Sequence, residues 1–145
     1  EAYGFAKGYC EFLDNAKTER EAVAWSVKAL EKAGFKEYEY GMPVKTGDKV
    51  YVNNRGKNIF AAVVGKEPFK NGFTIAAAHI DSPRLDLKQH PLYEDSGMAF
   101  FKTHYYGGIK KYQWTAIPLS LEGVAVLRDG TVVDLSDNGY TFCTF

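Results

Sequence analysis

The sequence predicts an α/β fold that continues into a mostly antiparallel β-rich region. Three patterns along its 145 residues lead to this prediction. An amphipathic helix occupies the N-terminal third, two nearly continuous apolar runs follow it, and alternating strands with frequent turns fill the remainder. A helix followed by strands that are apolar on both faces is typical of a layered α/β core.

The N-terminal helix carries signals for its own start and stop. Thr18 and Glu21 have capping-box spacing, in which each side chain accepts a hydrogen bond from the backbone N–H of the other. Gly34 follows the helix as a left-handed stop. Between these signals the apolar side chains recur at helical intervals, at Val23, Val27 and Leu30. We therefore expect an amphipathic helix that packs against the rest of the core.

Two apolar runs have the composition of strands buried on both faces. They span residues 58–65 and 73–81, and the second becomes polar only at its C-terminal end. Before them, residues 49–54 alternate as a half-buried strand does, and residues 54–57 have the sequence of a hairpin turn. We expect these segments to form the sheet of the α/β core.

The character of the chain changes after Lys88. Turn signals become frequent, with an acidic turn at residues 94–97 and a hairpin signal at residues 128–130. We therefore assign residues 1–88 to the N-terminal part of the α/β domain and residues 89–145 to the beginning of a β-rich domain.

Charge and composition exclude several classes of function. Eighteen basic residues balance eighteen acidic ones, so the chain lacks the basic surface expected of a nucleic-acid binder or of a protein that binds anionic membranes. No apolar run approaches the roughly 20 residues that span a bilayer, and no secretory signal opens the sequence. We expect a cytoplasmic protein in which Cys10 and Cys143 are reduced, with a disulfide between them as the alternative.

The residues with chemical potential lie at the end of the second apolar run. In α/β sheets, ligands gather at the carboxyl ends of strands, where His79 and Asp81 stand. A spacing of two in an extended segment places both side chains on one face. A metal-bound imidazole needs its second nitrogen held by an acceptor, and a carboxylate is the usual one. The alternative is an ordinary hydrogen-bonded pair, since catalytic zinc normally has three protein ligands and neither His90 nor His104 shows ligand spacing.

Two neighbouring features are open to two interpretations each. Arg84 and Lys88 follow the His-x-Asp motif at strand spacing, and either face the same site or form ion pairs and contact solvent. Residues 105–108, Tyr-Tyr-Gly-Gly, form either a binding loop or a turn between two β segments.

Longer runs of sequence resemble one enzyme family. Residues 78–88, Ala-His-Ile-Asp-Ser-Pro-Arg-Leu-Asp-Leu-Lys, look like the first metal-site segment of the aspartyl aminopeptidase/aminopeptidase I family of zinc metallopeptidases. Residues 102–114 and 119–123 are similar to its Tyr-Gly-Gly block and to the strand beyond, and residues 17–21 fit its N-terminal helix. Residues 114–118 lack the acidic run of the eukaryotic branch, which places the chain nearer the bacterial branch.

The resemblance implies a fold, an activity and an assembly. The family has an α/β/α catalytic domain interrupted by an inserted β-rich, barrel-like domain through which large tetrahedral homo-oligomers form. By resemblance, His79 is the first ligand of a two-zinc site, which cobalt or manganese could also fill, and Asp81 is the catalytic residue that orients it. The substrate is a peptide, which loses its N-terminal residue.

The same resemblance places the remaining ligands and the general base beyond Phe145. The chain also begins within a helical pattern and ends on an apolar run at residues 140–145, so we expect it to be a segment of a longer polypeptide that is inactive alone. The alternative function is a non-catalytic β-rich assembly or binding module that kept the sequence pattern without the chemistry.

Overall fold

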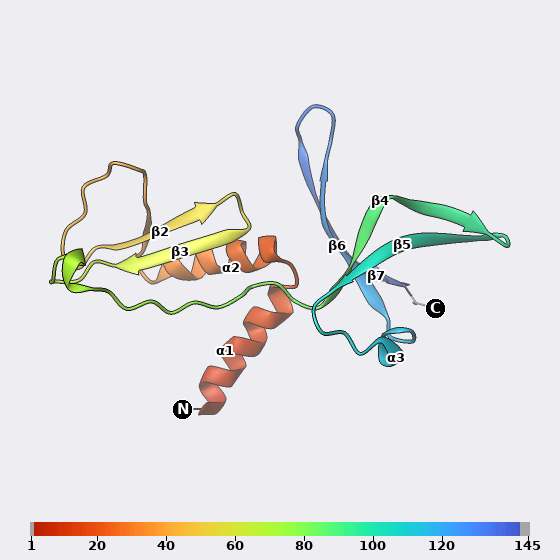
Figure 1. Ribbon diagram of the computed structural model, residues 1–145, viewed down its shortest axis with the longest axis horizontal. Helices are drawn as coiled ribbons and strands as arrows, with labels where there is room; N and C mark the ends of the chain where they lie inside the picture. The colour runs from red at the N-terminus through yellow and green to blue at the C-terminus, as the bar shows by residue number, and fades with distance from the viewer. Residues whose placement is uncertain (1, 143–145) are drawn as a thin grey trace. The chain divides into compact units, whose positions relative to one another are not determined.

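The computed structural model describes residues 2–142, so Cys143 and the end of the apolar run at 140–145 lie outside the described residues. The chain divides into two compact units, the first ending at Asp81 and the second beginning at Ser82. The first unit combines helices with a small sheet, and the second is built of β-hairpins (Figure 1). The elements of the first unit are α1 (Ala2–Asn15), α2 (Glu19–Lys32), β1 (Lys36–Glu37), β2 (Lys49–Asn54), β3 (Asn58–Val63) and the 3₁₀ turn η1 (Phe69–Asn71).

The predicted start and stop of α2 are both confirmed. The Glu21 amide donates to Thr18 Oγ1 at 3.3 Å, and the Thr18 amide donates to Glu21 Oε2 at 2.8 Å. The helix ends at Lys32, and Gly34 follows with φ of 85° while its amide donates to the Glu31 carbonyl. Local sequence therefore sets both ends of this helix.

One face of the sheet is covered by α2. Ala22 and Val23 on the helix are buried, and so is Tyr51 on β2, which is 3% exposed. The Tyr51 hydroxyl donates to Glu31 Oε1 at 2.9 Å, which ties the helix to the strand. The helix α1 joins this core through Phe12, whose ring meets that of Trp25 edge-on with centroids 5.0 Å apart. The predicted packing of an amphipathic helix on the strands is thus confirmed.

The sheet has the order β1-β2-β3, with β1 parallel and β3 antiparallel to β2. The hairpin predicted at residues 54–57 is present: Arg55 and Gly56 have φ of 62° and 67°, and the Lys57 amide donates to the Asn54 carbonyl at 3.2 Å. Two successive residues at positive φ match the twist of the flanking strands, which favours this tight connection.

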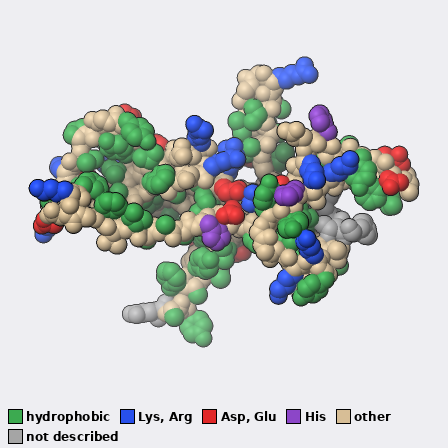
Figure 2. Space-filling model, in the orientation of Figure 1, with side chains coloured by type: hydrophobic (Ala, Val, Ile, Leu, Met, Phe, Trp, Pro, Cys, Tyr) green, Lys and Arg blue, Asp and Glu red, His purple; other side chains and the backbone are tan. Residues whose placement is uncertain are grey.

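Within residues 2–142 the other face of the sheet is uncovered, contrary to the expectation of burial on both sides. Because side chains alternate along a strand, the partners Val52 and Phe60 project from the face opposite Tyr51. Val52 is half-buried, whereas Phe60 on β3 is 62% exposed. Figure 2 shows many hydrophobic side chains on the surface of this unit. The composition of β3 is therefore that of a central layer, although only one side is covered here.

The prediction of a strand at residues 73–81 is wrong for the described chain. Residues 72–83 carry no regular secondary structure and run as a long extended coil (Figure 1). Their apolar side chains are mostly exposed, with Ile75 at 71% and Phe73 at 68%. A strand exists only where a neighbour completes its hydrogen bonds, and within residues 2–142 no strand pairs with this segment.

The second unit confirms the predicted change to antiparallel β structure. It contains β4 (Arg84–Asp95), β5 (Met98–Tyr106), the short helix α3 (Lys111–Trp114), β6 (Leu119–Val126) and β7 (Val132–Phe142). The strands pair as two antiparallel ribbons, β4-β5 and β6-β7, and no closed barrel is seen among residues 82–142. No helix in the described part of the chain is long and apolar enough to cross a membrane.

Both predicted turns close these ribbons. In the first, Ser96 and Gly97 have φ of 52° and 77°, and the Gly97 amide donates to Glu94 Oε1 at 2.8 Å. In the second, the Thr131 amide donates to Asp129 Oδ1 at 2.9 Å, and this bond holds the pKa of the Asp129 carboxyl below its usual value. Short-range sequence signals therefore fix where each ribbon reverses.

Replacing the helix cap tests the capping box. Thr18→Ala removes the acceptor for the Glu21 amide and is expected to lower the free energy of unfolding by about 1 kcal/mol. Thr18→Ser keeps a hydroxyl at the cap and should stay close to the wild type. Urea unfolding followed by circular dichroism measures both, and equal stability of the Ala and Ser variants would contradict the cap.

Replacing Tyr51 tests the bond that joins α2 to the sheet. Burial, followed by the hydrogen bond and charge of Glu31, raises the pKa of Tyr51 above 10.0. The neutral phenol therefore stabilises the fold fully below about pH 10, and this contribution falls as the pH rises through the raised folded-state pKa. Tyr51→Phe should cost about 1 kcal/mol at pH 7 and show a shallower loss of stability above pH 10. Tyr40→Phe, at a position 92% exposed, is the control and should keep the stability of the wild type at pH 7.

Candidate metal-ligand site

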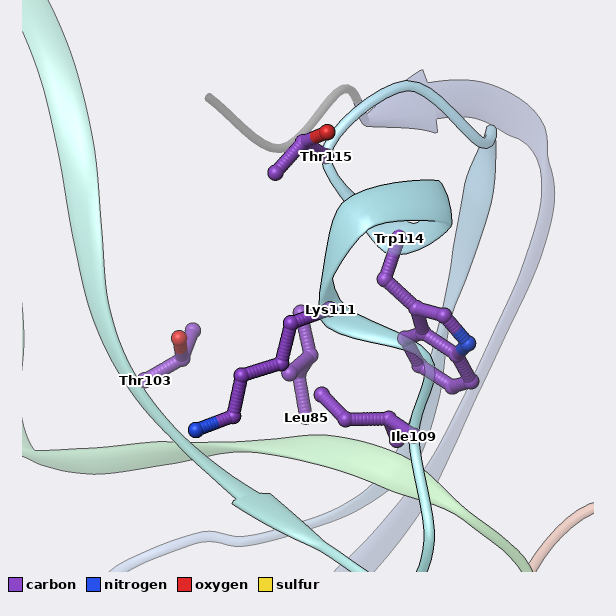
Figure 3. Close-up of a pocket in the computed structure, with 6 residues that line it drawn as sticks. All are labelled: Leu85, Thr103, Ile109, Lys111, Trp114 and Thr115. Atoms are coloured by element: carbon purple, nitrogen blue, oxygen red, sulfur yellow. The ribbon is translucent and has the colours of Figure 1, made fainter.

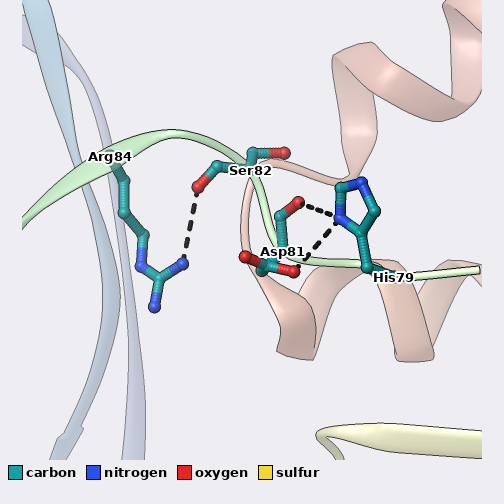
Figure 4. A network of polar contacts seen from close by, with 4 residues as sticks. All are labelled: His79, Asp81, Ser82 and Arg84. Carbon is teal, nitrogen blue, oxygen red and sulfur yellow. Dashed lines mark hydrogen bonds and ion pairs between the residues drawn. The ribbon is translucent and has the colours of Figure 1, made fainter. Parts of the chain in front are cut away.

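The His-x-Asp motif lies on the coil between η1 and β4. His79 Nδ1 is 3.1 Å from Asp81 Oδ1 and 3.0 Å from the Asp81 carbonyl oxygen, so one residue presents two acceptors to the same nitrogen (Figure 4). Both side chains are open to solvent, with His79 at 83% and Asp81 at 51% exposed. The predicted proximity of the two side chains is confirmed, although the segment that carries them is a coil and not the end of a strand.

This contact determines which nitrogen of His79 is available. Both acceptors face Nδ1, so the neutral ring places its proton there and keeps a lone pair on Nε2. In Figure 4 the second ring nitrogen points away from Asp81. An imidazole with one nitrogen held by a carboxylate and the other exposed has the arrangement of a metal ligand with its orienting partner. The donor chemistry of this pair therefore fits zinc as one ligand.

A single imidazole does not make a metal centre. Among residues 2–142, no group of three or more His, Cys, Asp or Glu side chains converges closely enough to hold an ion. His90 lies in β4 with φ of 50°, and the ring of His104 in β5 contacts that of Tyr106 edge-on with centroids 4.7 Å apart. The structure brings neither of them into a group with His79.

The residues that follow the motif form a polar network of their own. Arg84 Nε donates to Asp86 Oδ1 at 2.8 Å. Figure 4 shows another bond of this guanidinium, in which Nη1 donates to the Ser82 carbonyl at 3.4 Å. The Arg84 guanidinium also lies over the Tyr106 ring, 5.0 Å from its centroid. Of the two interpretations of Arg84, the structure supports the ion pair.

The Tyr-Tyr-Gly-Gly segment is a turn that leaves β5, which supports the second interpretation of residues 105–108. Tyr105 and Tyr106 end the strand, and Gly107 begins the turn with φ of 78°. Next to it is a shallow hollow of about 190 Å³, shown in Figure 3. Its lining comes from β4, β5 and the segment around α3: Leu85, Thr103, Ile109, Lys111, Trp114 and Thr115. Sequence analysis did not find this hollow, because its walls come from separate elements.

Comparison with known proteins places this chain in a family. Residues 12–138 match the family described as aminopeptidase I zinc metalloprotease (M18). The chain belongs to the M18 aminopeptidase I family. The predicted family is thereby confirmed, and the matched residues include the His-x-Asp motif and both β-ribbons down to residue 138.

The M18 relatives are similar over nearly the whole chain. A Clostridium acetobutylicum protein named "Probable M18 family aminopeptidase 1" is 52% identical over 93% of this chain and 30% of its own length. The crystal structure of aminopeptidase I from Borrelia burgdorferi B31 matches 97% of this chain and 36% of its own at 39% identity, with a TM-score of 0.90. The M18 structure from Thermotoga maritima has a TM-score of 0.82 at 46% identity over 92% of this chain and 30% of its own. The chain thus spans about a third of these M18 proteins.

The protonation of His79 provides a test of this geometry. We expect the neutral ring to carry its proton on Nδ1, because both Asp81 acceptors face that nitrogen. Two-dimensional ¹⁵N–¹H NMR of the ring distinguishes the tautomers. Asp81→Ala should reduce the Nδ1–H fraction, since only the backbone carbonyl remains as an acceptor. A predominantly Nε2–H ring in the metal-free wild type would contradict the arrangement.

Proposed function

We propose that this chain supplies the first metal ligand of a zinc-dependent aminopeptidase. The observation that carries the proposal is the His79–Asp81 pair, in which Nδ1 is held at 3.0–3.1 Å and Nε2 is open to solvent. The pair lies in a chain of the M18 family, whose description names a zinc metalloprotease. Together they favour a catalytic role for the motif over an ordinary surface hydrogen bond.

In this proposal the two side chains have different tasks. His79 binds the metal through Nε2, and Asp81 holds the imidazole in the tautomer that leaves this nitrogen free. The carboxylate also stabilises the positive charge that the ring shares with the metal. Zinc supplies Lewis-acid chemistry at such a site, because it polarises a scissile carbonyl and activates water.

The complete site would need groups that residues 2–142 do not bring together. We propose two zinc ions per site, with cobalt or manganese as alternatives, because affinity alone does not select the metal. The other ligands and the general base would come from elsewhere in the polypeptide. The substrate would be a peptide whose free N-terminal amine reaches the metal site. The isolated segment would bind zinc weakly and hydrolyse nothing, since one ligand does not make a catalytic centre.

The second half of the chain is proposed to serve assembly. In this assignment, residues 1–88 belong to the catalytic domain, and residues 89–145 begin an inserted, barrel-like domain that joins subunits into a tetrahedral homo-oligomer in the cytoplasm. Exposed apolar side chains near the tip of the β6-β7 ribbon support an interaction surface: Val126 at 67%, Val132 at 59% and Leu127 at 50%. The same side chains would also serve a non-catalytic assembly module, which is the alternative function.

Substituting the proposed ligand separates these two functions. In the full-length protein, hydrolysis of aminoacyl nitroanilides should be lost on chelation and restored by zinc. His79→Ala should reduce kcat/KM at least about 100-fold, because it removes a metal ligand, and Asp81→Ala about 10–100-fold, because it removes only the orienting group. Bound zinc is measured in parallel by elemental analysis.

The matched control is His90→Asn, which replaces another exposed histidine with a residue that tolerates its φ of 50°. Its activity and its sensitivity to chelation should equal those of the wild type. Full activity in His79→Ala would remove this residue from the metal shell. A folded wild type with neither bound zinc nor peptidase activity would favour the assembly module instead.

A further inference from the structure

The turn after β5 approaches the chain immediately downstream of the His-x-Asp motif. Gly107 has φ of 78°, and a Cβ atom added to it would lie 3.1 Å from Pro83 Cα and 3.3 Å from Pro83 Cγ. A contact of 3.1 Å is tighter than nine in ten that real Cβ atoms make, and the atom it meets belongs to the backbone, which would have to shift. Glycine is therefore required here both for its backbone angle and for the close approach.

This contact closes the end of the β4-β5 ribbon. The last paired residues are Arg84 and Tyr106, and the next residue on each strand is Pro83 or Gly107. Pro83 has no N–H to donate to the ladder, and its close approach to Gly107 marks the end of the paired region. The Arg84 guanidinium reinforces this end, because it lies over the Tyr106 ring and donates to the Ser82 carbonyl.

The anchored residues are adjacent in sequence to the partner of the imidazole. Asp81 is bonded directly to Ser82, and its own backbone carbonyl is one of the two acceptors at His79 Nδ1. On the other side, the nearest regular element is η1, which ends at Asn71. The motif thus lies eight residues after one element and three before the next.

We propose that Gly107 is a positioning residue of the metal site. Because Gly107 has no side chain, the end of the β4-β5 ribbon can hold Pro83 closely. Pro83 in turn fixes the backbone that presents Asp81 to His79. This inference rests on the proposed function of His79 as a metal ligand. Gly107 touches neither metal nor substrate in this role, and it acts through Pro83.

Zinc affinity of the full-length protein tests the role of Gly107. Gly107→Ala should raise the zinc dissociation constant about tenfold or more, the range typical of a disturbed orienting group, with an unchanged far-UV circular dichroism spectrum. Gly108→Ala is the matched control, because a Cβ there meets nothing within 4 Å, and it should stay within twofold of the wild type. The visible spectrum of the cobalt-substituted protein should change in Gly107→Ala and not in Gly108→Ala, a readout that stability alone does not move.

A second variant decides the matter if Gly107→Ala does not fold. Pro83→Ala removes the ring that Gly107 faces and leaves the glycine turn intact, so it should raise the zinc dissociation constant at least threefold in a folded protein. If Gly107→Ala folds, a zinc affinity within twofold of the wild type overturns the positioning role. If it does not fold, the same result in Pro83→Ala overturns it. An unchanged affinity in His79→Ala instead overturns the proposed function itself, so the two failures are distinguishable.

Discussion

The burial of one side of a small sheet by α2 is the interaction on which the first unit depends. Among the described residues, the buried hydrophobic side chains are Ala16, Ala22, Val23 and Tyr51, and the last three lie on α2 or β2. Burial of apolar surface is the main stabilising term in folding. Because this core is small, burial stabilises the rest of the unit only weakly. The coil that carries His79 lies outside it. The contacts that hold this histidine are therefore local ones, with Asp81, and its side chain is 83% exposed.

Features encoded within a few residues could be predicted from the sequence. The capping box of α2 and the turns at Arg55, Ser96 and Asp129 each involve neighbours at most four positions apart. The His79–Asp81 contact belongs to the same class, because a spacing of two in an extended segment places both side chains on one face. Family membership was also within reach, since the M18 motifs are continuous runs of sequence.

Features that depend on distant partners could not be predicted in the same way. Residues 73–81 have the composition of a central strand, but composition does not state whether a neighbouring strand is present to pair with it. The contact between Pro83 and Gly107 joins positions 24 residues apart, and it follows from the β4-β5 register, which no local pattern specifies. A metal site is likewise built by residues from several segments, so a single segment with His79 does not show whether the site is complete.

A register shift divides the β4-β5 ribbon into an inner part, next to the histidine motif, and an outer part that ends in the turn at Ser96. Between the Leu87–Thr103 and Leu92–Phe101 pairs, residues 88–91 lie opposite Lys102 alone, and His90 there takes a positive φ. An excess of residues on one strand bends and twists a ribbon locally, so the alternation of side chains beyond the bend is set independently of that before it. The outer part can consequently lengthen, shorten or change its surface during evolution without shifting the register of the inner part. Variation in the outer part is thereby isolated from the strand ends beside the histidine motif.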